Sequence, residues 1–90
     1  MAKRRNKLEI IYDMLKSIQD KRGEIKPTHL LYKSNLSYKN LMLYVGELME
    51  NGLIEEKTDD GQKRYILTIK GIDYLVKYNE IRKFSDSFGL

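Results

Sequence analysis

The spacing of the apolar residues changes at Gly52. Upstream of this glycine they recur every three or four positions, as on one face of a helix over residues 38–51. Downstream, the chain is rich in β-branched and aromatic residues and is divided by Asp60-Gly61, a dipeptide typical of tight hairpin turns. The sequence therefore predicts a helix that leads directly into a β-hairpin, with strands over residues 54–57 and 63–67 and a turn over residues 58–62.

An earlier helix is predicted over residues 7–20. Its apolar residues lie at intervals of three and four, and Gly23 ends it where a left-handed conformation is least costly. Residues 24–26 are too few for a helix and predict a short strand. The residues expected to face the core are Leu8, Ile11, Leu15 and Ile18, and Ile10 and Met14 widen this apolar band.

A second helix is predicted over residues 28–33, because Pro27, the only proline, suits a first helical turn. Residues 34–36 then form a tight turn, and Ser37 is a good N-cap for the third helix. Two helices joined by a short turn are a helix-turn-helix, and a hairpin directly after it is a wing. The inward-facing residues of the third helix are Leu41, Val45, Leu48 and Met49.

A last helix is predicted over residues 69–83, capped by Thr68. One of its apolar stripes, Ile72, Leu75 and Val76, closes the domain's own core. A second stripe is surplus to a domain this small and predicts contact with a second copy. The expected fold class is α+β, a winged helix-turn-helix in the order α-β-α-α-β-β-α with a C-terminal dimerisation helix. The predicted dimer residues are Tyr74, Leu75, Tyr78, Ile81, Phe84 and Phe88.

Several segments carry a family resemblance. The most specific are Ile25-Lys26-Pro27-Thr28 and Asn35-Leu36-Ser37-Tyr38, whereas Gly52-Leu53-Ile54 is common to winged helices generally. Over residues 7–78 the chain resembles the small archaeal winged-helix family, which includes ten-kilodalton chromatin-associated dimers and several transcription regulators. The resemblance implies a winged-helix fold, double-stranded DNA as ligand, and dimerisation through the C-terminal helix, which in the chromatin members is a long antiparallel coiled coil.

The chain departs from that family at its C-terminal end. Asn79 is expected to interrupt the last helix, and residues 85–90 read as a poor helical tail, which leaves the length of the coiled coil open. The predicted division is a flexible basic arm over residues 1–6, a winged helix-turn-helix over residues 7–68 and a dimerisation helix over residues 69–90.

The third helix of this fold enters the major groove, so its outward-facing residues are the candidate DNA contacts. Lys39 suits a phosphate or a guanine edge, and Asn40 suits an adenine. The hydroxyls of Ser37 and Tyr38 suit phosphates. The alternative interpretation is that Ser37 only caps the helix and Tyr38 only covers core.

Met42 and Leu43 are unusual on a recognition helix. Apolar side chains contact a thymine methyl group but read no pattern of donors and acceptors, so direct base readout is expected to be sparse. One of the two fits the core equally well. Leu43 is included among the predicted DNA contacts.

The predicted wing and the N-terminal arm add basic residues. Because phosphates repel the acidic tip Asp59-Asp60, the flanks of the wing are expected to touch DNA while the tip stays clear. The arm is expected to lie along phosphates or in a minor groove. Solvated charges and an ordinary flexible terminus are the alternatives. The predicted contacts are Lys57, Gln62, Lys63 and Arg64 of the wing and Arg4 and Arg5 of the arm.

Composition argues against other classes of protein. There is no cysteine, and His29, the only histidine, has no clustered carboxylates beside it, so neither a metal nor a cofactor is expected. The carboxylate pairs at residues 55–56 and 59–60 point apart or into solvent, and no nucleophile has a base beside it, so no enzymatic activity is expected. The basic N-terminus lacks the apolar run of a signal peptide or a membrane span, which predicts a cytoplasmic, nucleoid-associated protein.

Seventeen basic against thirteen acidic residues give a net charge of +4, which suits a polyanionic partner. The leading hypothesis is a homodimer that binds double-stranded DNA as a transcription regulator or an architectural protein, with no small-molecule ligand. The alternative is a protein-interaction module without DNA binding, in which Met42 and Leu43 dock a partner.

Overall fold

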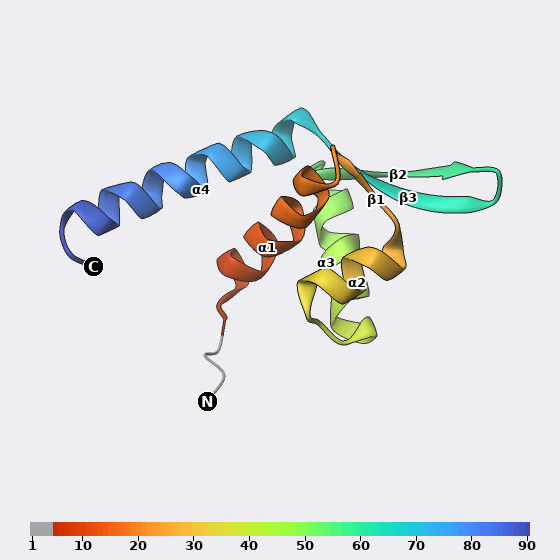
Figure 1. Cartoon of the computed structure of the whole chain (residues 1–90), viewed down its shortest axis with the longest axis horizontal. Helices are drawn as coiled ribbons and strands as arrows, with labels where there is room; N and C mark the ends of the chain where they lie inside the picture. Colours follow the sequence, from red (N-terminus) through yellow and green to blue (C-terminus); the bar gives the residue numbers. More distant parts are fainter. Residues whose placement is uncertain (1–4) are drawn as a thin grey trace.

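The computed structural model describes residues 5–90. It has the order of helices and strands that the sequence predicts, so the α+β winged helix-turn-helix with a C-terminal helix is confirmed (Figure 1). The elements are α1 (Lys7–Asp20), β1 (Glu24–Ile25), α2 (Pro27–Ser34), α3 (Tyr38–Glu50), β2 (Ile54–Asp59), β3 (Gln62–Leu67) and α4 (Ile69–Ser87).

The sheet is antiparallel, in the order β1-β3-β2. β2 and β3 pair over six residues each, so the turn of the wing contains only Asp60 and Gly61. Both residues have positive φ angles, 51° and 76°, as a type I′ turn requires. The strands are longer than predicted because the turn takes two residues where the sequence suggested five. The wing projects well away from the helices (Figure 1).

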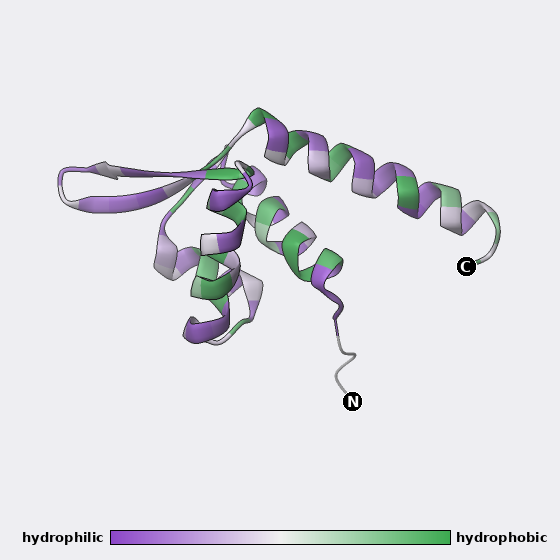
Figure 2. Ribbon diagram, turned by 180° about the vertical axis from the view of Figure 1, so that it is seen from behind, coloured by the Kyte–Doolittle hydropathy of each residue, from purple (hydrophilic) through white to green (hydrophobic). Residues whose placement is uncertain are grey.

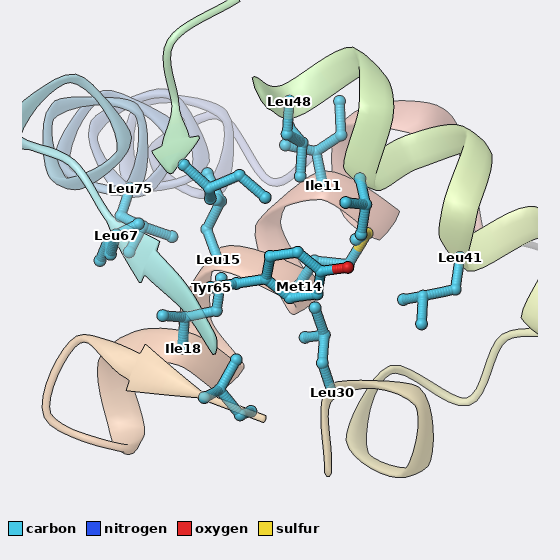
Figure 3. Close-up of a cluster of buried hydrophobic side chains, with 13 residues drawn as sticks. Ile11, Met14, Leu15, Ile18, Leu30, Leu41, Leu48, Tyr65, Leu67 and Leu75 are labelled. Carbon is cyan, nitrogen blue, oxygen red and sulfur yellow. The ribbon is translucent and has the colours of Figure 1, made fainter. Parts of the chain in front are cut away.

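The core lies between the helices and the inner face of the sheet, and Tyr65 of β3 is fully buried in it (Figure 3). The inner stripe predicted for the third helix is confirmed, because Leu41, Val45 and Leu48 are at most 1% exposed. Burying one such aliphatic side chain stabilises a fold by roughly 1.5–3 kcal/mol. The other core residues are Ile11, Met14, Leu15, Ile18, Ile25, Leu30, Ile54, Leu67 and Leu75.

The inner face of α1 differs from the prediction at one end. Ile11, Leu15 and Ile18 are buried as expected, and Met14 is fully buried with them. The prediction that Leu8 faces the core is wrong, since its side chain is 58% exposed. Leu8 lies in the first turn of the helix, where it lines a surface groove beside α4.

α4 is longer than predicted. It runs through Asn79 without interruption, so the expected break is wrong, and it ends at Ser87, so the expected poor helical tail is wrong for residues 85–87 and holds only for residues 88–90. Two side-chain contacts fit the longer helix. The hydroxyl of Tyr12 in α1 donates to Asn79 Oδ1 at 3.5 Å, and the hydroxyl of Ser87 donates to the carbonyl of Phe84 at 2.7 Å.

The face of α4 that meets the body also differs from the prediction. Leu75 is buried, but Ile72 and Val76 are 42% and 48% exposed, so their assignment to the core is wrong. The helix is turned so that Gly71 lies against the body, where a Cβ atom would overlap the carbonyl oxygen of Leu53. This close approach rotates Ile72 and Val76 towards the surface.

Within residues 5–90, no helix combines the length and the apolar character needed to cross a membrane.

Candidate nucleic-acid interface

The turn between α2 and α3 fixes the start of the candidate recognition helix. Asn35 adopts a left-handed conformation, with φ 55°, and ends α2. Ser37 is the N-cap of α3, and its hydroxyl accepts a hydrogen bond from the backbone N–H of Asn40 at 3.2 Å. Ser37 therefore does cap the helix, and its side chain is also exposed.

The outer face of α3 is open. Tyr38 and Leu43 are 67% and 65% exposed, and Lys39, Asn40 and Gly46 are exposed as well. Tyr38 therefore does not cover core. The five contacts predicted here, Ser37, Tyr38, Lys39, Asn40 and Leu43, are therefore all exposed, and they offer a mixture of polar, basic and apolar groups.

Met42 and Leu43 separate in the structure. Leu43 points outwards, whereas Met42 is half-buried. Neither belongs to the buried core cluster or to the side chains packed against it. The apolar part of the outer face is thus Leu43, flanked by polar residues on the helix.

The four predicted contacts of the wing lie on two faces. Tyr65 and Leu67 of β3 point into the core, so Lys63, two positions before Tyr65, is on that same face of the strand. Gln62 and Arg64 point to the opposite face, and Lys57, the register partner of Arg64, is on that face too.

The two basic residues of β3 make only loose ion pairs. Lys63 Nζ lies 3.5 Å from Glu56 Oε1, and Arg64 Nη1 lies 3.7 Å from Glu24 Oε1. Their side chains are 45% and 40% exposed. Partly exposed pairs contribute about 0–1 kcal/mol, so both cations are free to exchange their partner for a phosphate.

Arg5 is engaged within the molecule. Its Nη1 donates to Asp13 Oδ2 at 2.7 Å, and its Nη2 donates to the carbonyl oxygen of Ser34 at 2.9 Å. Arg5 therefore ties the chain before α1 to the end of α2. Its predicted DNA contact stays a prediction, and Arg4 lies outside the described residues.

A basic hollow of about 320 Å³ adjoins the base of the wing and was not foreseen from the sequence. It brings together the end of α1, β1, the start of α2 and Arg64 of β3. The signal present in the sequence is the basic residues around Glu24 and Pro27, but only the fold shows that they share one surface. The lining residues are Lys21, Glu24, Ile25, Lys26, His29 and Arg64.

His29 does not form part of a metal site in the described chain. Within residues 5–90, no group of three or more histidines and carboxylates is arranged to hold a metal ion. The pKa of the imidazole is lowered, first by burial and then by repulsion from Lys21 and Lys33.

The predicted dimer residues divide into two groups. Leu75 is buried in the core, and the ring of Tyr78 stacks on Tyr12 of α1 with centroids 4.4 Å apart. Tyr74 donates its hydroxyl to the carbonyl of Leu8 at 3.1 Å. These three residues dock α4 onto its own domain. Ile81 and Phe84 of α4 and Phe88, its C-cap, are each 67% exposed. The C-terminal part of α4 extends away from the body (Figure 2).

An apolar groove of about 340 Å³ runs between α1 and α4 and extends as far as the exposed residue Ile81. Leu8, Tyr74, Tyr78 and Ile81 form its apolar walls, and Lys70 and Lys77 lie at its rim. Burial raises the pKa of Tyr74 and of Tyr78, in keeping with their position against α1.

Comparison with known families and proteins gives consistent results. Residues 4–86 match the family described as winged helix-turn-helix. Protein MJ0290 of Methanocaldococcus jannaschii is 38% identical over 78 residues, which is 87% of this chain but 34% of that protein. Protein MJ0287 of the same organism is 34% identical over 68 residues, which is 69% of this chain and 68% of that protein. The chain thus spans about a third of the length of the first relative.

Solved structures have the same fold. Sso10a-2, a DNA-binding protein from Sulfolobus solfataricus, superimposes with a TM-score of 0.80 at 24% identity, covering 93% of this chain and 85% of that one. F93 from STIV, a winged-helix DNA-binding protein, gives 0.74 at 18% identity, covering 88% and 92%. MepR, a transcription regulator of a Staphylococcus aureus multidrug efflux pump, gives 0.77 at 14% identity, covering 88% and 60%. The predicted resemblance to small archaeal winged-helix proteins is confirmed.

Proposed function

Because the chain belongs to the winged helix-turn-helix family, we propose that it binds double-stranded DNA as a homodimer and acts as a transcription regulator or an architectural protein. The observation that carries this proposal is the two-sided character of α3. Its inner stripe anchors it in the core, while Tyr38, Lys39, Asn40 and Leu43 are exposed on its outer side.

The shape and charge of this surface fit a duplex. The major groove is about 12 Å wide and admits one helix. Lys39 and Asn40 lie in the first turn of α3, which contains no acidic residue, so no carboxylate offsets the positive end of the helix dipole, which favours a phosphate. Lys57 and Arg64 of the wing add cations on a neighbouring surface. Sso10a-2 and F93, which share the fold, are described as DNA-binding proteins and support this proposal.

The composition of the outer face favours modest sequence specificity. Asn40 and Lys39 are the groups suited to read base edges, and Leu43 contributes only apolar contact. An architectural protein binds any duplex with near-equal affinity, whereas a regulator prefers its site by about a thousandfold or more. Competition between random and genomic duplexes separates the two roles.

The exposed end of α4 supports the homodimer. Tyr74, Ile81 and Phe88 are separated by seven residues, and Phe84 lies between the last two at the spacing of a heptad seam. Ile81, Phe84 and Phe88 are each 67% exposed, which is costly on an isolated domain. A second copy of the same seam would cover these three side chains.

The test is the affinity for a random duplex measured by fluorescence anisotropy across a salt series. If each subunit neutralises four or five phosphates, log affinity falls against log salt with a slope of roughly −4 per subunit. Absence of binding at low salt contradicts the proposal and leaves the protein-interaction module as the function of this face. Binding with a flat salt response contradicts the proposed phosphate contacts.

A further inference from the structure

The basic hollow beside the wing has an excess of positive charge. Lys21, Lys26 and Arg64 supply three cations against the single carboxylate of Glu24, and His29 adds a titratable group. The one ion pair inside it, between Arg64 and Glu24, is 3.7 Å long and about 40% exposed on both sides. A pair of this kind contributes about 0–1 kcal/mol, so it holds Arg64 only weakly.

Arg64 also has a donor without an acceptor. Its Nε atom is buried, and among the described residues it has no hydrogen-bond partner. A buried donor left in this state costs about 1–3 kcal/mol. The hollow thus combines surplus positive charge with a guanidinium group that its one ion pair holds only weakly, and the oxygen atoms of an anion match both.

The start of α2 adds to this field. Lys26 is its N-cap but makes no side-chain hydrogen bond to the helix, and Pro27 occupies the first turn. The backbone N–H groups of Thr28 and His29 therefore receive no cap from Lys26. The positive end of the helix lies where Lys26 and His29 line the hollow.

The hollow adjoins the wing part of the proposed DNA surface. Arg64 is on the same face of the wing as Lys57 and Gln62. The start of α2 lies below the wing, on the side to which the wing projects, and α3 begins on that side too (Figure 1). A DNA backbone that lies along this face of the wing therefore comes close to the hollow.

We propose that the hollow seats a phosphate of the DNA backbone, held by Lys21, Lys26, His29 and Arg64, next to the groove that α3 enters. This inference rests on the proposed function and extends its surface to α1 and to the start of α2. Three of these four residues are absent from the contacts predicted from the sequence. The ligand class is a phosphodiester of double-stranded DNA.

The first test is the double variant Lys21→Gln/Lys26→Gln in the full chain, measured in the same salt series with random duplex. Because the hollow seats one phosphate, its loss reduces the magnitude of the salt slope by about 1 per subunit and the affinity at 0.1 M salt by roughly tenfold. The control is Lys16→Gln/Lys83→Gln, which changes the net charge equally at exposed sites outside the hollow. Thermal unfolding establishes that both double variants are folded.

The second test uses a variant that is expected to raise the affinity for duplex DNA. Glu24→Gln removes the only carboxylate of the hollow and releases Arg64, so duplex affinity rises severalfold. The proposal is overturned if Lys21→Gln/Lys26→Gln behaves like its control, or if Glu24→Gln leaves the affinity unchanged.

Two further measurements separate the possible failures. If the wild type binds duplex and Lys39→Gln weakens it while the hollow variants do not, the proposed function stands and this inference fails. If the wild type binds no duplex, both fail. Calorimetry with inorganic phosphate at constant ionic strength identifies a free-anion site: binding that Lys21→Gln/Lys26→Gln abolishes, with an unchanged duplex salt slope, overturns the assignment to DNA.

Discussion

Two helical glycines, Gly71 in α4 and Gly46 in α3, differ in whether the structure has room for a Cβ atom. At Gly71 an added Cβ atom overlaps the carbonyl oxygen of Leu53 and lies 2.5 Å from Leu67 Cδ1, so backbone has to move. At Gly46, on the outer side of α3, an added Cβ atom meets nothing within 4 Å. The same substitution is therefore expected to have opposite effects at the two positions.

We predict that Gly71→Ala lowers the free energy of unfolding by about 1–3 kcal/mol, the cost of overpacking. Gly46→Ala is its matched control and raises it by about 1 kcal/mol, the gain in helix propensity. Urea unfolding followed by circular dichroism measures both. Equal effects of the two substitutions would show that α4 does not approach Leu53 as closely as described.

The buried hydroxyl group of Tyr65 also affects the stability of the fold. Its side chain is fully buried, and its hydroxyl has no hydrogen-bond partner among residues 5–90. Removing an unsatisfied buried hydroxyl relieves a desolvation cost, so Tyr65→Phe is expected to stabilise the fold by about 1 kcal/mol. Tyr32→Phe is the control, because Tyr32 is 83% exposed. A clear loss of stability in Tyr65→Phe would mean that the hydroxyl is hydrogen-bonded.

His29 predicts a pH dependence of DNA binding. Its pKa in the free protein is lowered from 6.5 by burial and by nearby cations, so the imidazole is neutral at pH 7. A phosphate in the hollow favours the protonated form and raises the pKa in the complex, so binding takes up a proton and affinity rises as the pH falls from the pKa of the bound form towards that of the free form. The charged groups around the imidazole are Lys21 at the C-cap of α1, Glu24 of β1, Lys26 at the N-cap of α2, Lys33 of α2 and Arg64 of β3.

The measurement is duplex affinity between pH 5.5 and 7.5 at constant ionic strength. His29→Gln is expected to remove the part of the pH dependence that lies in this window. A variant that keeps the full dependence would assign the titration to another group.

At the scale of elements, periodicity predicted the kinds of element and their order. The stripe of Leu41, Val45 and Leu48 has a helical period, and Asp60-Gly61 marks a hairpin, because both patterns are local. Periodicity did not identify which stripe of the last helix is buried. That choice depends on two contacts between distant segments, the stacking of Tyr78 on Tyr12 and the fit of Gly71 against Leu53.

The candidate site, too, could be predicted from the sequence only where its residues follow a local pattern. Sequence spacing identified the exposed residues of α3, since they lie opposite a clear apolar stripe. It did not show that Lys63 and Arg64 lie on opposite faces of the wing, which requires the strand register. Nor did it show that Arg5 hydrogen-bonds the carbonyl of Ser34, 29 positions along the chain, or that Lys21 and Arg64 line one hollow. These contacts arise only from the packing of the elements.

The exposed half of α4 gives a prediction about assembly. Ile81→Glu/Phe84→Glu places charge on the proposed seam and is expected to convert a dimer into a monomer in sedimentation equilibrium. These positions are preferable to Tyr78, because Tyr78 also holds α4 to α1. Ile72→Glu/Val76→Glu is the matched control, with the same charge change on another exposed part of the helix. An unchanged mass in the first variant would show that the interface lies elsewhere.

At the scale of the whole molecule, the parts form a body, a projecting wing and an extended helix (Figure 1). The helices and the sheet bury one side of α3 and leave the other side open. The basic hollow lies at the base of the wing. In the homodimer proposed to form through α4, each of the two copies presents its own DNA surface, which doubles the number of phosphate contacts. The central claim is that the outer side of α3 enters a DNA groove.

The most direct measurement of this claim is the duplex affinity of Leu43→Glu. Leu43 is 65% exposed and outside the core, so the substitution leaves the fold intact while placing a carboxylate against the bases and phosphates. We predict a loss of affinity on the order of a hundredfold at 0.1 M salt, with thermal stability unchanged and with Val76→Glu binding nearly as the wild type does. Leu43→Glu that binds duplex as tightly as Val76→Glu would contradict the account.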